Sequence, residues 1–511
     1  MPALAFPAPN VEYLGWFGLV PGLLLMHAAP TRREAAARGW WFGAGFLLAS
    51  LYWLLPNLGP GLLLVVAVLG VLWTSVGVAV WTLLRPPVTV RRAGAALAVV
   101  PSCWVAVDWV RSWQGFGGPW AVLGASQWQH PAVLALAAVG GVWLISFALV
   151  AANTGLLIAL VASRNWVRLL GVAAALAAIA AGPVAFALTP AVPTVRQVKV
   201  ALVQPGIAPN PALRVDASQR LSADLSGHRA DLIVWGESSV AYDLNKDPAL
   251  LSQIRGLAAA DGAQILLNQD SVTPAGAKSK VAVLVGSNGI DGRYVKTRLV
   301  PFGEYIPFRQ QLGWLTSVSR AAPQNMIPGT GAHVLRVTPA HGPPLNVGVL
   351  ICFESAFPDM SRVATDRGAQ LIIYQTSDST FQASWALAQH AALGALRAAE
   401  TGRPVVQAAL TGDSAAFDPR GRPLAWGGAG FRGVLDVPLG LPPVSARTLY
   451  DQLGDYVPWT AVGIAALAAG AGLIRGRRDR LHPPQLDRLD QPQPDWSPRA
   501  GPHSLEPQPP A

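Results

Sequence analysis

The chain has 511 residues, of which 52% are hydrophobic and only 13% charged, and its formal net charge is +10. So apolar a composition excludes an ordinary soluble protein of this length. The positive charge does not indicate a nucleic-acid-binding protein, because the arginines cluster beside apolar segments and in the C-terminal tail, with no basic stripe of interleaved aromatic residues.

Charge is distributed unevenly along the chain. Residues 40–84 contain no Asp, Glu, Lys or Arg, whereas residues 195–457 have a normal globular composition. Seven segments of about 20 mostly apolar residues are candidate membrane-spanning helices. They are residues 11–28, 40–58, 61–84, 93–112, 140–163, 167–189 and 458–474. The predicted organisation is a bundle of six spans (1–190), a folded domain (191–457), a last span (458–475) and a tail (476–511).

The stretch 132–163 is too long for one straight span. Gly140-Gly141 predicts a break, which leaves residues 132–139 as an interfacial or re-entrant piece. None of the spans is expected to be a cleavable signal peptide, because no basic region precedes the first one.

Basic residues lie in alternate connections between the spans. They are Arg32, Arg33 and Arg38, then Arg85, Arg91 and Arg92, then Arg164 and Arg168, and finally Arg475, Arg477, Arg478 and Arg480. The positive-inside rule places these segments in the cytoplasm and residues 190–457 outside it. Seven spans with an inside C-terminus require an outside N-terminus, so we expect either direct translocation or a further upstream helix. The Pro-, Gln- and Asp-rich tail is predicted to be disordered and cytosolic.

Asp108 and Arg111 lie three residues apart near the end of the fourth span, on one helical face. Ionisable groups at membrane depth are costly, so such a pair is either functional or a structural ion pair near the interface. Both alternatives remain open from sequence. The Gly- and Trp-rich stretch 115–131 after it is predicted to be an ordered interfacial loop.

Short apolar runs alternate with helical patterns from residue 198 onward. The predicted strands are residues 198–206, 231–239, 263–270, 281–289, 345–354, 369–378 and 403–412, and the predicted helices are 248–260 and 383–400. Continuous apolar runs are typical of strands covered on both faces. The alternation indicates a layered α/β fold.

Polar residues follow three of these strands: Glu237, Lys296 and Cys352. A thiol needs a base to become a nucleophile, and a carboxylate whose pKa is raised by burial could serve. A lysine beside both would stabilise a tetrahedral oxyanion. An inert packing cysteine is the alternative, and His390 is a second candidate base. Lys278 and Lys280 are interpreted as surface lysines. With two cysteines, no disulfide framework is expected.

The order Glu237, Lys296, Cys352, together with "YVKTRLVPFGEYIP" (294–307) and "ICFES" (351–355), resembles the nitrilase superfamily of carbon-nitrogen hydrolases. The resemblance is closer to its membrane branch, the apolipoprotein N-acyltransferases. It implies a polytopic α-helical membrane bundle plus an extracytoplasmic α/β nitrilase-like αββα sandwich domain. That family normally has eight spans, and residues 4–10 resemble the segment after its first helix.

The resemblance also implies roles for individual residues. Cys352 would form a thioester, Glu237 would be the general base and Lys296 would stabilise the oxyanion. Glu304 and Glu354 match further acidic positions that orient the site, and Phe353 stands where the family often has Tyr. Two departures are Gly236, where the family has Pro, and "TSDSTF" (376–381), which lacks the family's Asn and Trp.

The implied activity is transfer of a fatty acyl chain from a phospholipid, phosphatidylethanolamine, to a diacylglyceryl-cysteine lipoprotein in a bacterial cytoplasmic (inner) membrane, by a monomer facing the periplasm. Residues 308–326, with Leu312, Trp314 and Leu315, are predicted to be a membrane-touching lid or a packed surface loop. No metal ligand cluster or phosphate-binding loop is seen, so no cofactor is expected. The alternatives are a membrane-anchored amidase, a non-catalytic scaffold derived from the enzyme, and a transporter.

Overall fold

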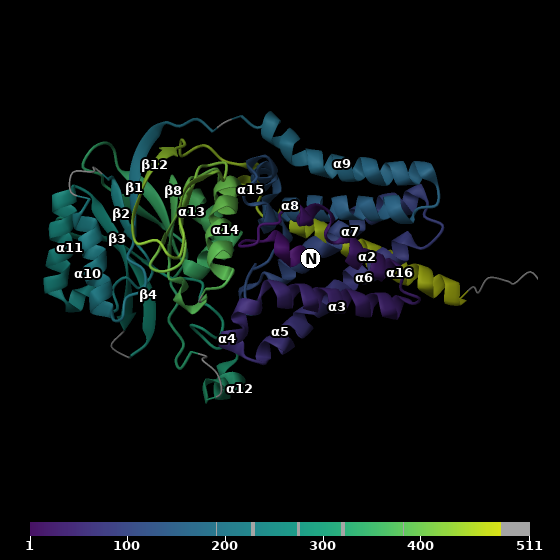
Figure 1. The fold of residues 1–511 in the computed structure, drawn as a ribbon, viewed down its shortest axis with the longest axis horizontal. Coiled ribbons are helices and arrows are strands. Elements are labelled where there is room, and N and C mark those ends of the chain that lie inside the picture. The colour runs from purple at the N-terminus through teal and green to yellow at the C-terminus, as the bar shows by residue number, and fades with distance from the viewer. Residues whose placement is uncertain (191, 226–229, 273–275, 318–321, 382, 482–511) are drawn as a thin grey trace, which may run out of the picture. The chain divides into compact units, whose positions relative to one another are not determined.

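Helices make up most of the first 190 residues of the computed structural model, which describes residues 1–190, 192–225, 230–272, 276–317, 322–381 and 383–481 (Figure 1). Residues 1–465 form one compact unit and residues 466–511 a second. The helices of the bundle are α1 (Leu14–Phe17), α2 (Val20–His27), α3 (Arg32–Ser50), α4 (Leu55–Leu58), α5 (Gly61–Gly70), α6 (Thr74–Leu84), α7 (Val90–Arg111), α8 (Pro131–Val161) and α9 (Asn165–Leu188), and α16 (Tyr456–Leu481) follows the α/β domain.

Five helical segments are long and apolar enough to cross a membrane. They are Gly61–Leu84, Val90–Arg111, Pro131–Val161, Asn165–Leu188 and Tyr456–Ile474. A sixth is the pair Arg32–Ser50 and Tyr52–Leu58, which is bent by 64°. The first predicted span is only a short apolar stretch, Leu14–His27. At about 1.5 Å per residue it is shorter than the roughly 30 Å hydrocarbon core.

Helix α8 is broken where the sequence predicts. Gly140 and Gly141 leave helical geometry, and Gly141 has a φ angle of +69°. A Cβ at Gly141 would lie 2.7 Å from the ring of Tyr450, so glycine serves both the conformation and the close approach. The freed backbone N–H of Val142 donates to the Glu400 carboxylate at 2.9 Å.

Asp108 and Arg111 form a buried ion pair at the end of α7, with Arg111 Nη2 2.8 Å from Asp108 Oδ1. Trp104 Nε1 donates to the other Asp108 oxygen, and Arg111 donates to the carbonyls of Trp120 and Ala121. These bonds join the end of α7 to the loop that follows it, which supports the structural alternative. The pair holds the following loop, whose residues 118–128 are buried, as expected for an ordered loop.

The α/β domain contains two six-stranded sheets. Their orders are β12-β1-β2-β3-β4-β5 and β11-β10-β9-β8-β7-β6. The strands are β1 (Arg196–Gln204), β2 (Leu232–Trp235), β3 (Gln264–Val272), β4 (Lys278–Gly286), β5 (Gly289–Val295), β6 (Val334–Val337), β7 (Leu345–Ile351), β8 (Leu371–Thr376), β9 (Val405–Ala409), β10 (Ser414–Phe417), β11 (Pro423–Gly427) and β12 (Gly433–Leu441). All seven predicted strands are present, while β5, β6 and β10–β12 were not predicted.

The two sheets pack face to face between helical layers. On β1, Val200 and Leu202 face the core shared with the second sheet, whereas Ala201 and Val203 face α10 (Pro211–Ala223) and α11 (Pro248–Asp261). Helices α13 (Pro358–Asp366) and α14 (Ala386–Thr401) cover the second sheet, and α15 (Leu449–Leu453) follows β12 (Figure 1). This is the predicted αββα sandwich. The parallel strands β1–β3 and β7–β9 end at one edge, where the polar residues gather.

The predicted loop 308–326 and the predicted C-terminal tail are only partly described by the structure. In the segment 308–326 the structure describes α12 (Arg309–Leu312), the turn Gly313–Ser317 and an exposed Trp314, while residues 318–321 and the Leu315 side chain lie outside the described part. Helix α16 continues to Leu481, so the prediction of disorder is wrong for residues 476–481, and the rest of the predicted tail lies outside the described residues from 482 onward.

Candidate active site

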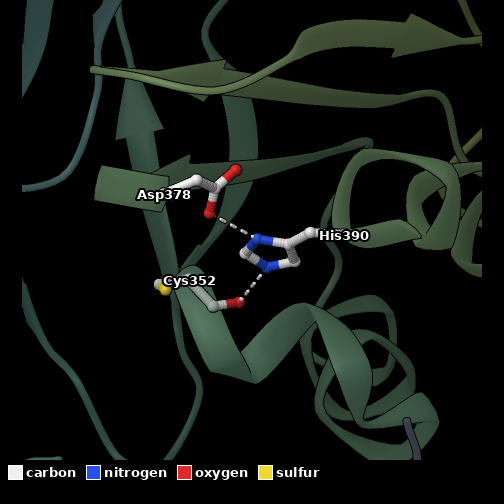
Figure 2. Close-up of side chains that lie close together, drawn as sticks. All are labelled: Cys352, Asp378 and His390. Atoms are coloured by element: carbon white, nitrogen blue, oxygen red, sulfur yellow. Dashed lines mark hydrogen bonds and ion pairs between the residues drawn. The ribbon is translucent and has the colours of Figure 1, made fainter. Parts of the chain in front are cut away.

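Cys352 lies at a sharp turn between β7 and the 3-10 helix Cys352–Ala356. Its φ angle is +51°, a left-handed conformation that few non-glycine residues adopt. The turn directs the carbonyl oxygen and the sulfur of Cys352 to opposite sides (Figure 2). Such strained conformations cluster at functional sites, because the surrounding structure must compensate for their cost. Cys352 therefore does not have the position of a packing residue within a strand.

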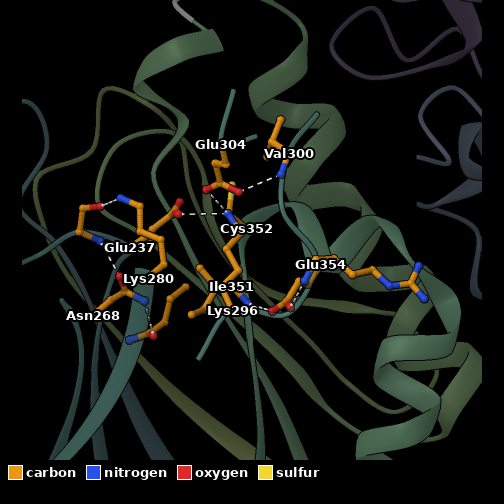
Figure 3. Close-up of polar contacts among 12 residues, drawn as sticks. Glu237, Asn268, Lys280, Lys296, Val300, Glu304, Ile351, Cys352 and Glu354 are labelled. Carbon is orange, nitrogen blue, oxygen red and sulfur yellow. Dashed lines mark hydrogen bonds and ion pairs between the residues drawn. The ribbon is translucent and has the colours of Figure 1, made fainter. Parts of the chain in front are cut away.

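Glu237, Lys296 and Cys352 come from the ends of three different strands and meet (Figure 3). Lys296 Nζ donates to Glu237 Oε1 at 3.3 Å and to Glu304 Oε1 at 2.7 Å. The Cys352 thiol lies close enough to the Glu237 carboxylate to contribute to lowering its pKa. Lys296 is only 1% exposed, so this ammonium is held by carboxylates instead of water. The fold thus assembles a thiol, a base and a cation in one buried site.

The turn that carries Glu237 is fixed by one backbone contact to the second sheet and by one side chain of its own sheet. The Glu237 N–H donates to the Thr376 carbonyl at the end of β8, and the Ser238 N–H donates to Asn268 Oδ1, both at 3.0 Å. A Cβ at Gly236 would lie 2.1 Å from the Leu410 backbone nitrogen. The glycine at this position therefore permits a close approach of two chain segments.

Glu354 connects the lysine segment to the cysteine turn. Its Oε1 accepts from the N–H groups of Thr297 and Arg298 at 2.7 and 2.9 Å, and its Oε2 accepts from the Ile351 N–H at 2.7 Å. Tyr294 donates a further bond to the same carboxylate. Of these residues, Thr297 and Ile351 are direct neighbours of Lys296 and Cys352. Glu354 is thus placed to fix their separation, in keeping with its predicted orienting role.

Glu304 and Phe353 lie on either side of this core. Glu304 uses one oxygen for Lys296 and the other for the Val300 N–H at 2.8 Å, so its position is fixed at both ends. Phe353 is buried against Phe357 with ring centroids 4.9 Å apart. A Cβ at Gly118 would lie 3.0 Å from the Phe353 Cζ atom, where a tyrosine would carry its hydroxyl. Phe353 therefore serves here as a packing ring under the loop that follows α7.

Charges at the site favour a neutral thiol beside an ionised base. Burial acts to raise the pKa of Glu237, but Lys296 and Lys280, with a contribution from Cys352, outweigh it and hold that pKa below its usual value. Burial raises the pKa of the Cys352 thiol, and the Glu237 charge raises it further against Lys296. Burial lowers the pKa of Lys296, yet Glu237 and Glu304 leave it well above its usual value.

This charge state corrects one expectation from the sequence, which called for a Glu237 pKa raised towards neutrality. The carboxylate is ionised instead, because two lysines outweigh its burial. An ionised carboxylate that accepts the thiol proton is the arrangement of a general base. The proton would move during attack on the substrate, since the resting thiol holds it tightly.

Lys280 is a site residue that sequence reasoning missed. It is 16% exposed, its Nζ lies 2.6 Å from Asp270 Oδ1, and it also donates to Ser238 Oγ. The interpretation of Lys280 as a surface lysine is therefore wrong, whereas Lys278 is exposed as expected. Lys280 lies on β4, which is adjacent to β5, the strand that leads to Lys296. This proximity follows from the order of strands in the sheet, which the sequence alone does not reveal.

His390 lies beside the site but does not take the role of base. Its Nδ1 lies 2.8 Å from Asp378 Oδ1 and its Nε2 lies 3.1 Å from the Cys352 carbonyl oxygen (Figure 2). The sequence shows no ligand cluster, yet one donor atom each from Cys352, Asp378 and His390 lie within 4.8 Å of one another. Both ring nitrogens are engaged, so an ion here would have to displace one of these bonds.

Aromatic residues from the bundle cover this side of the site. Trp53, next to the bend after α3, packs on Phe381 with ring centroids 4.9 Å apart, and Trp120 lies 5.6 Å from His390. Trp53 and Trp120 also contact each other at 5.2 Å. The apolar bundle therefore continues directly into the wall of the candidate site.

Comparisons with known proteins agree with the two-part organisation. The family model described as "Apolipoprotein N-acyltransferase N-terminal domain" matches residues 1–155, and the model "Carbon-nitrogen hydrolase" matches residues 199–445. Curated relatives include the apolipoprotein N-acyltransferases of Geobacter metallireducens, 30% identical over 94% of both chains, and of Chlorobaculum tepidum, 28% identical over 92% of this chain and 94% of that protein. Among solved structures, an amidase from Nesterenkonia sp. is 21% identical over 51% of this chain and 95% of its own, with a TM-score of 0.35.

Proposed function

Since the chain belongs to the apolipoprotein N-acyltransferase family, we propose that it transfers a fatty acyl chain from a phospholipid to the N-terminal amine of diacylglyceryl-cysteine lipoproteins. The observation that carries this proposal is the contact of a buried lysine with Glu237, whose carboxylate lies beside Cys352 at the meeting point of three strand ends (Figure 3). We assign Cys352 as nucleophile, Glu237 as general base and Lys296 as oxyanion stabiliser.

In the first half-reaction, Cys352 Sγ attacks the carbonyl carbon of a phospholipid ester while its proton passes to Glu237. The Lys296 ammonium stabilises the negative charge on the carbonyl oxygen of the tetrahedral intermediate. Collapse of the intermediate breaks the ester C–O bond, and the departing lysophospholipid takes the proton from Glu237. A thioester on Cys352 remains.

In the second half-reaction, the lipoprotein amine attacks the thioester carbonyl and forms the new C–N bond. Glu237 accepts a proton from this nitrogen, and Lys296 again stabilises the oxyanion. Breakage of the C–S bond releases the amide, and the thiol regains its proton from Glu237. The balance needs no metal or redox cofactor.

The surroundings of the site support lipid substrates. Five apolar helices, with a bent sixth, are long enough to span a membrane, and bundle residues Trp53 and Trp120 line one side of the site. The arginine pattern supports a bacterial cytoplasmic membrane, with residues 191–457 facing the periplasm between the bundle 1–190 and the last span 458–475. Phosphatidylethanolamine is the proposed acyl donor, and a monomer is the proposed working unit.

The two cysteines of the chain give a matched test of the nucleophile. Cys103 is a free, buried cysteine of α7, outside the site. After incubation with phosphatidylethanolamine in detergent, intact-mass spectrometry should detect a thioester adduct on the wild type and on Cys103→Ser, and none on Cys352→Ser. A full adduct on Cys352→Ser would overturn the assignment.

The acceptor is tested on the loaded enzyme. Addition of a diacylglyceryl-cysteine peptide should remove the thioester and yield the N-acyl peptide. Rapid release of free fatty acid, at a rate that the peptide does not change, would instead indicate a hydrolase that uses water to resolve the same intermediate.

A further inference from the structure

We propose that Asp378 and His390 form a positioning pair that fixes the peptide group after Cys352 and so aims the backbone N–H of Phe353 at the oxyanion. The proposal deepens the proposed function, because it presumes that a tetrahedral intermediate forms on Cys352. In this account His390 acts through the nucleophile turn and does not itself contact the substrate.

The first step is the contact between His390 and the turn. His390 Nε2 lies 3.1 Å from the Cys352 carbonyl oxygen, and the opposite ring nitrogen lies 2.8 Å from Asp378 Oδ1. Both side chains are fully or almost fully buried. Asp378 begins the 3-10 turn Asp378–Phe381 after β8, and His390 lies on α14, so the pair connects two elements to the cysteine turn (Figure 2).

The second step concerns protons. A carbonyl oxygen can only accept a hydrogen bond, so Nε2 of His390 must carry a proton. The bond between Nδ1 and Asp378 Oδ1 also contains a proton, which lies either on the ring or on Asp378, whose pKa burial raises against the opposing effect of His390. Burial lowers the pKa of His390, but Asp378, the Cys352 carbonyl and Glu237 together raise it above its usual value. Asp378 thus keeps the ring as a donor towards Cys352.

The third step is the geometry of the peptide group. A trans peptide is planar, so its C=O and N–H bonds point in opposite directions. With the Cys352 carbonyl held towards His390, the Phe353 N–H points to the other side, where Figure 2 shows the sulfur of Cys352. Phe353 is in the first turn of a 3-10 helix, whose N–H groups have no acceptor within the helix. This N–H is available to a developing oxyanion beside Lys296.

The surroundings of the ring exclude a role as base. Both nitrogens are occupied, and the rings of Trp120 and Phe381 lie 5.6 and 5.9 Å from that of His390. A group so enclosed can orient the turn, but it cannot exchange protons with a substrate. The thiol already has a base in Glu237.

The test compares two reactions of Cys352 that differ in one respect. Acylation by an ester passes through an oxyanion, whereas alkylation by iodoacetamide does not. Full-length enzyme in detergent is acylated with phosphatidylethanolamine and, separately, with a p-nitrophenyl ester, and intact mass gives both rates. If the aryl ester acylates the wild type while the phospholipid does not, the proposed function fails and the positioning role is still measurable.

His390→Leu removes the donor, and His390→Gln restores an N–H that can reach a carbonyl. In His390→Leu we expect the acylation rate at saturating ester to fall about 10²-fold, with KM within about twofold and the alkylation rate within about threefold of wild type. His390→Gln should recover at least about tenfold of the loss. His333→Leu is the matched control, since His333 Nε2 also contacts a backbone carbonyl, at 2.8 Å, outside the site.

Asp378→Asn provides a second measurement if His390→Leu does not fold. An asparagine carbonyl can accept from Nδ1–H while the ring is neutral, which leaves Nε2 without a proton for Cys352. We expect acylation to fall about tenfold while alkylation is maintained. Equal losses in both reactions, unchanged acylation in His390→Leu or Asp378→Asn, or a His390→Gln variant no better than His390→Leu would each overturn the proposal.

Discussion

The α/β domain contains two buried clusters in which carboxylates form ion pairs with a basic side chain. The clusters share burial and ion pairing, but their carboxylates have different further neighbours. Around Lys296, the carboxylates of Glu237 and Glu304 lie within 3.3 Å of one ammonium. On α14, Arg397 Nε lies 2.8 Å from Glu400 Oε2, and all of these side chains are nearly inaccessible to water. We call the first the lysine cluster and the second the arginine cluster.

The partners of the carboxylates separate the two clusters. Glu400 accepts from Arg397 and from the Val142 N–H at the break of α8, and Arg397 also donates to the Ala356 carbonyl. The arginine cluster is therefore joined to backbone groups and anchors the α/β domain to the bundle. In the lysine cluster, Glu237 lies beside the thiol of Cys352, which contributes to lowering its pKa, so one member adjoins the proposed nucleophile (Figure 3).

Shifted pKa values alone would favour the arginine cluster over the proposed site. Burial raises the pKa of Glu400 to about 7, the value expected of an acid–base catalyst, while Lys296 and Lys280 overcome burial and lower that of Glu237. Perturbed titration is a probabilistic guide to active sites, because structural ion pairs show it too. The comparison teaches that our assignment of the site rests on the nearby thiol of Cys352, the proposed nucleophile, and not on the size of the pKa shift.

The largest expected effect comes from removal of the cation of the lysine cluster. Lys296→Met leaves two buried carboxylates without a counter-charge and the oxyanion without its ammonium. Thioester formation should fall by about 10³-fold or more, as measured by intact mass with phosphatidylethanolamine. Lys278→Met, at an exposed lysine, is the control and should react at the wild-type rate. Substantial acylation of Lys296→Met would show that the cation of the lysine cluster is not needed for thioester formation, and would contradict the contrast with the arginine cluster.

The arginine cluster should respond in stability instead of chemistry. The folded-state pKa of Glu400, about 7, lies above its usual value of 4.5, so the folded protein binds the extra proton between these pH values. This contribution is present at low pH and is lost as pH rises towards and past 7, which amounts to about 3 kcal/mol. Glu400→Gln keeps a neutral group at every pH. Its melting temperature relative to wild type should therefore increase from pH 5 to pH 8, with thioester formation retained.

Tryptophan fluorescence on heating in detergent gives this comparison at each pH. The difference between variant and wild type isolates Glu400 from the other groups that titrate nearby, such as Asp451, whose pKa burial raises to about 6. A constant difference across the pH range would show that Glu400 does not titrate in the folded protein, and would weaken the contrast with Glu237.

Glu354 tests whether the geometry of the lysine cluster depends on its supports. Its carboxylate joins the N–H groups of Thr297 and Arg298 to that of Ile351. Glu354→Gln turns one acceptor into a donor, which would face a backbone N–H and move Lys296 away from Cys352. An acylation rate lower by about 10²-fold is expected, since small displacements in an active site have effects of this size. Wild-type acylation would show that Lys296 is held in place without this carboxylate.

Much of the fold could be predicted because its central strands are continuous apolar runs. The edge strands were not predicted, since β5 contains two glycines and an aspartate and β12 contains a proline, which weaken the period-two pattern. The bend after α3 was also missed, because apolar composition alone does not distinguish a straight span from a bent pair. The break at Gly140-Gly141 was predicted correctly, since two adjacent glycines interrupt the apolar run.

Site residues that directly follow a predicted strand were found from the sequence. Site residues whose position depends on which strands or helices are adjacent in the fold were missed. Glu237, Lys296 and Cys352 were placed by strand ends and by a family resemblance that the curated relatives confirm at the level of the family. Their chemical roles stay predictions. Lys280 and Asp378 escaped notice, because nothing in the spacing of residues shows which strands are adjacent or which helix covers the turn.

The smallest expected effect concerns Lys280. This residue has an ion pair of its own, as the arginine cluster does, and also acts on the pKa of Glu237 in the lysine cluster. Its charge helps to hold the pKa of Glu237 below the usual value, although its hydrogen bonds go to Ser238 and Asp270. In Lys280→Met the pKa of Glu237 should rise, so a larger fraction is protonated in acid and cannot accept the thiol proton. The acid limb of the acylation profile should therefore move to higher pH, while the rate above neutrality stays within about threefold of wild type.

Lys278→Met, two residues away on β4 but exposed, separates this effect from a general loss of surface charge. Its acid limb should coincide with that of the wild type. If the two variants shift equally, the field of Lys280 does not reach Glu237, and Lys280 belongs with structural pairs such as those of the arginine cluster. If only Lys280→Met shifts, the lysine cluster contains a second cation that tunes its base without touching the thiol.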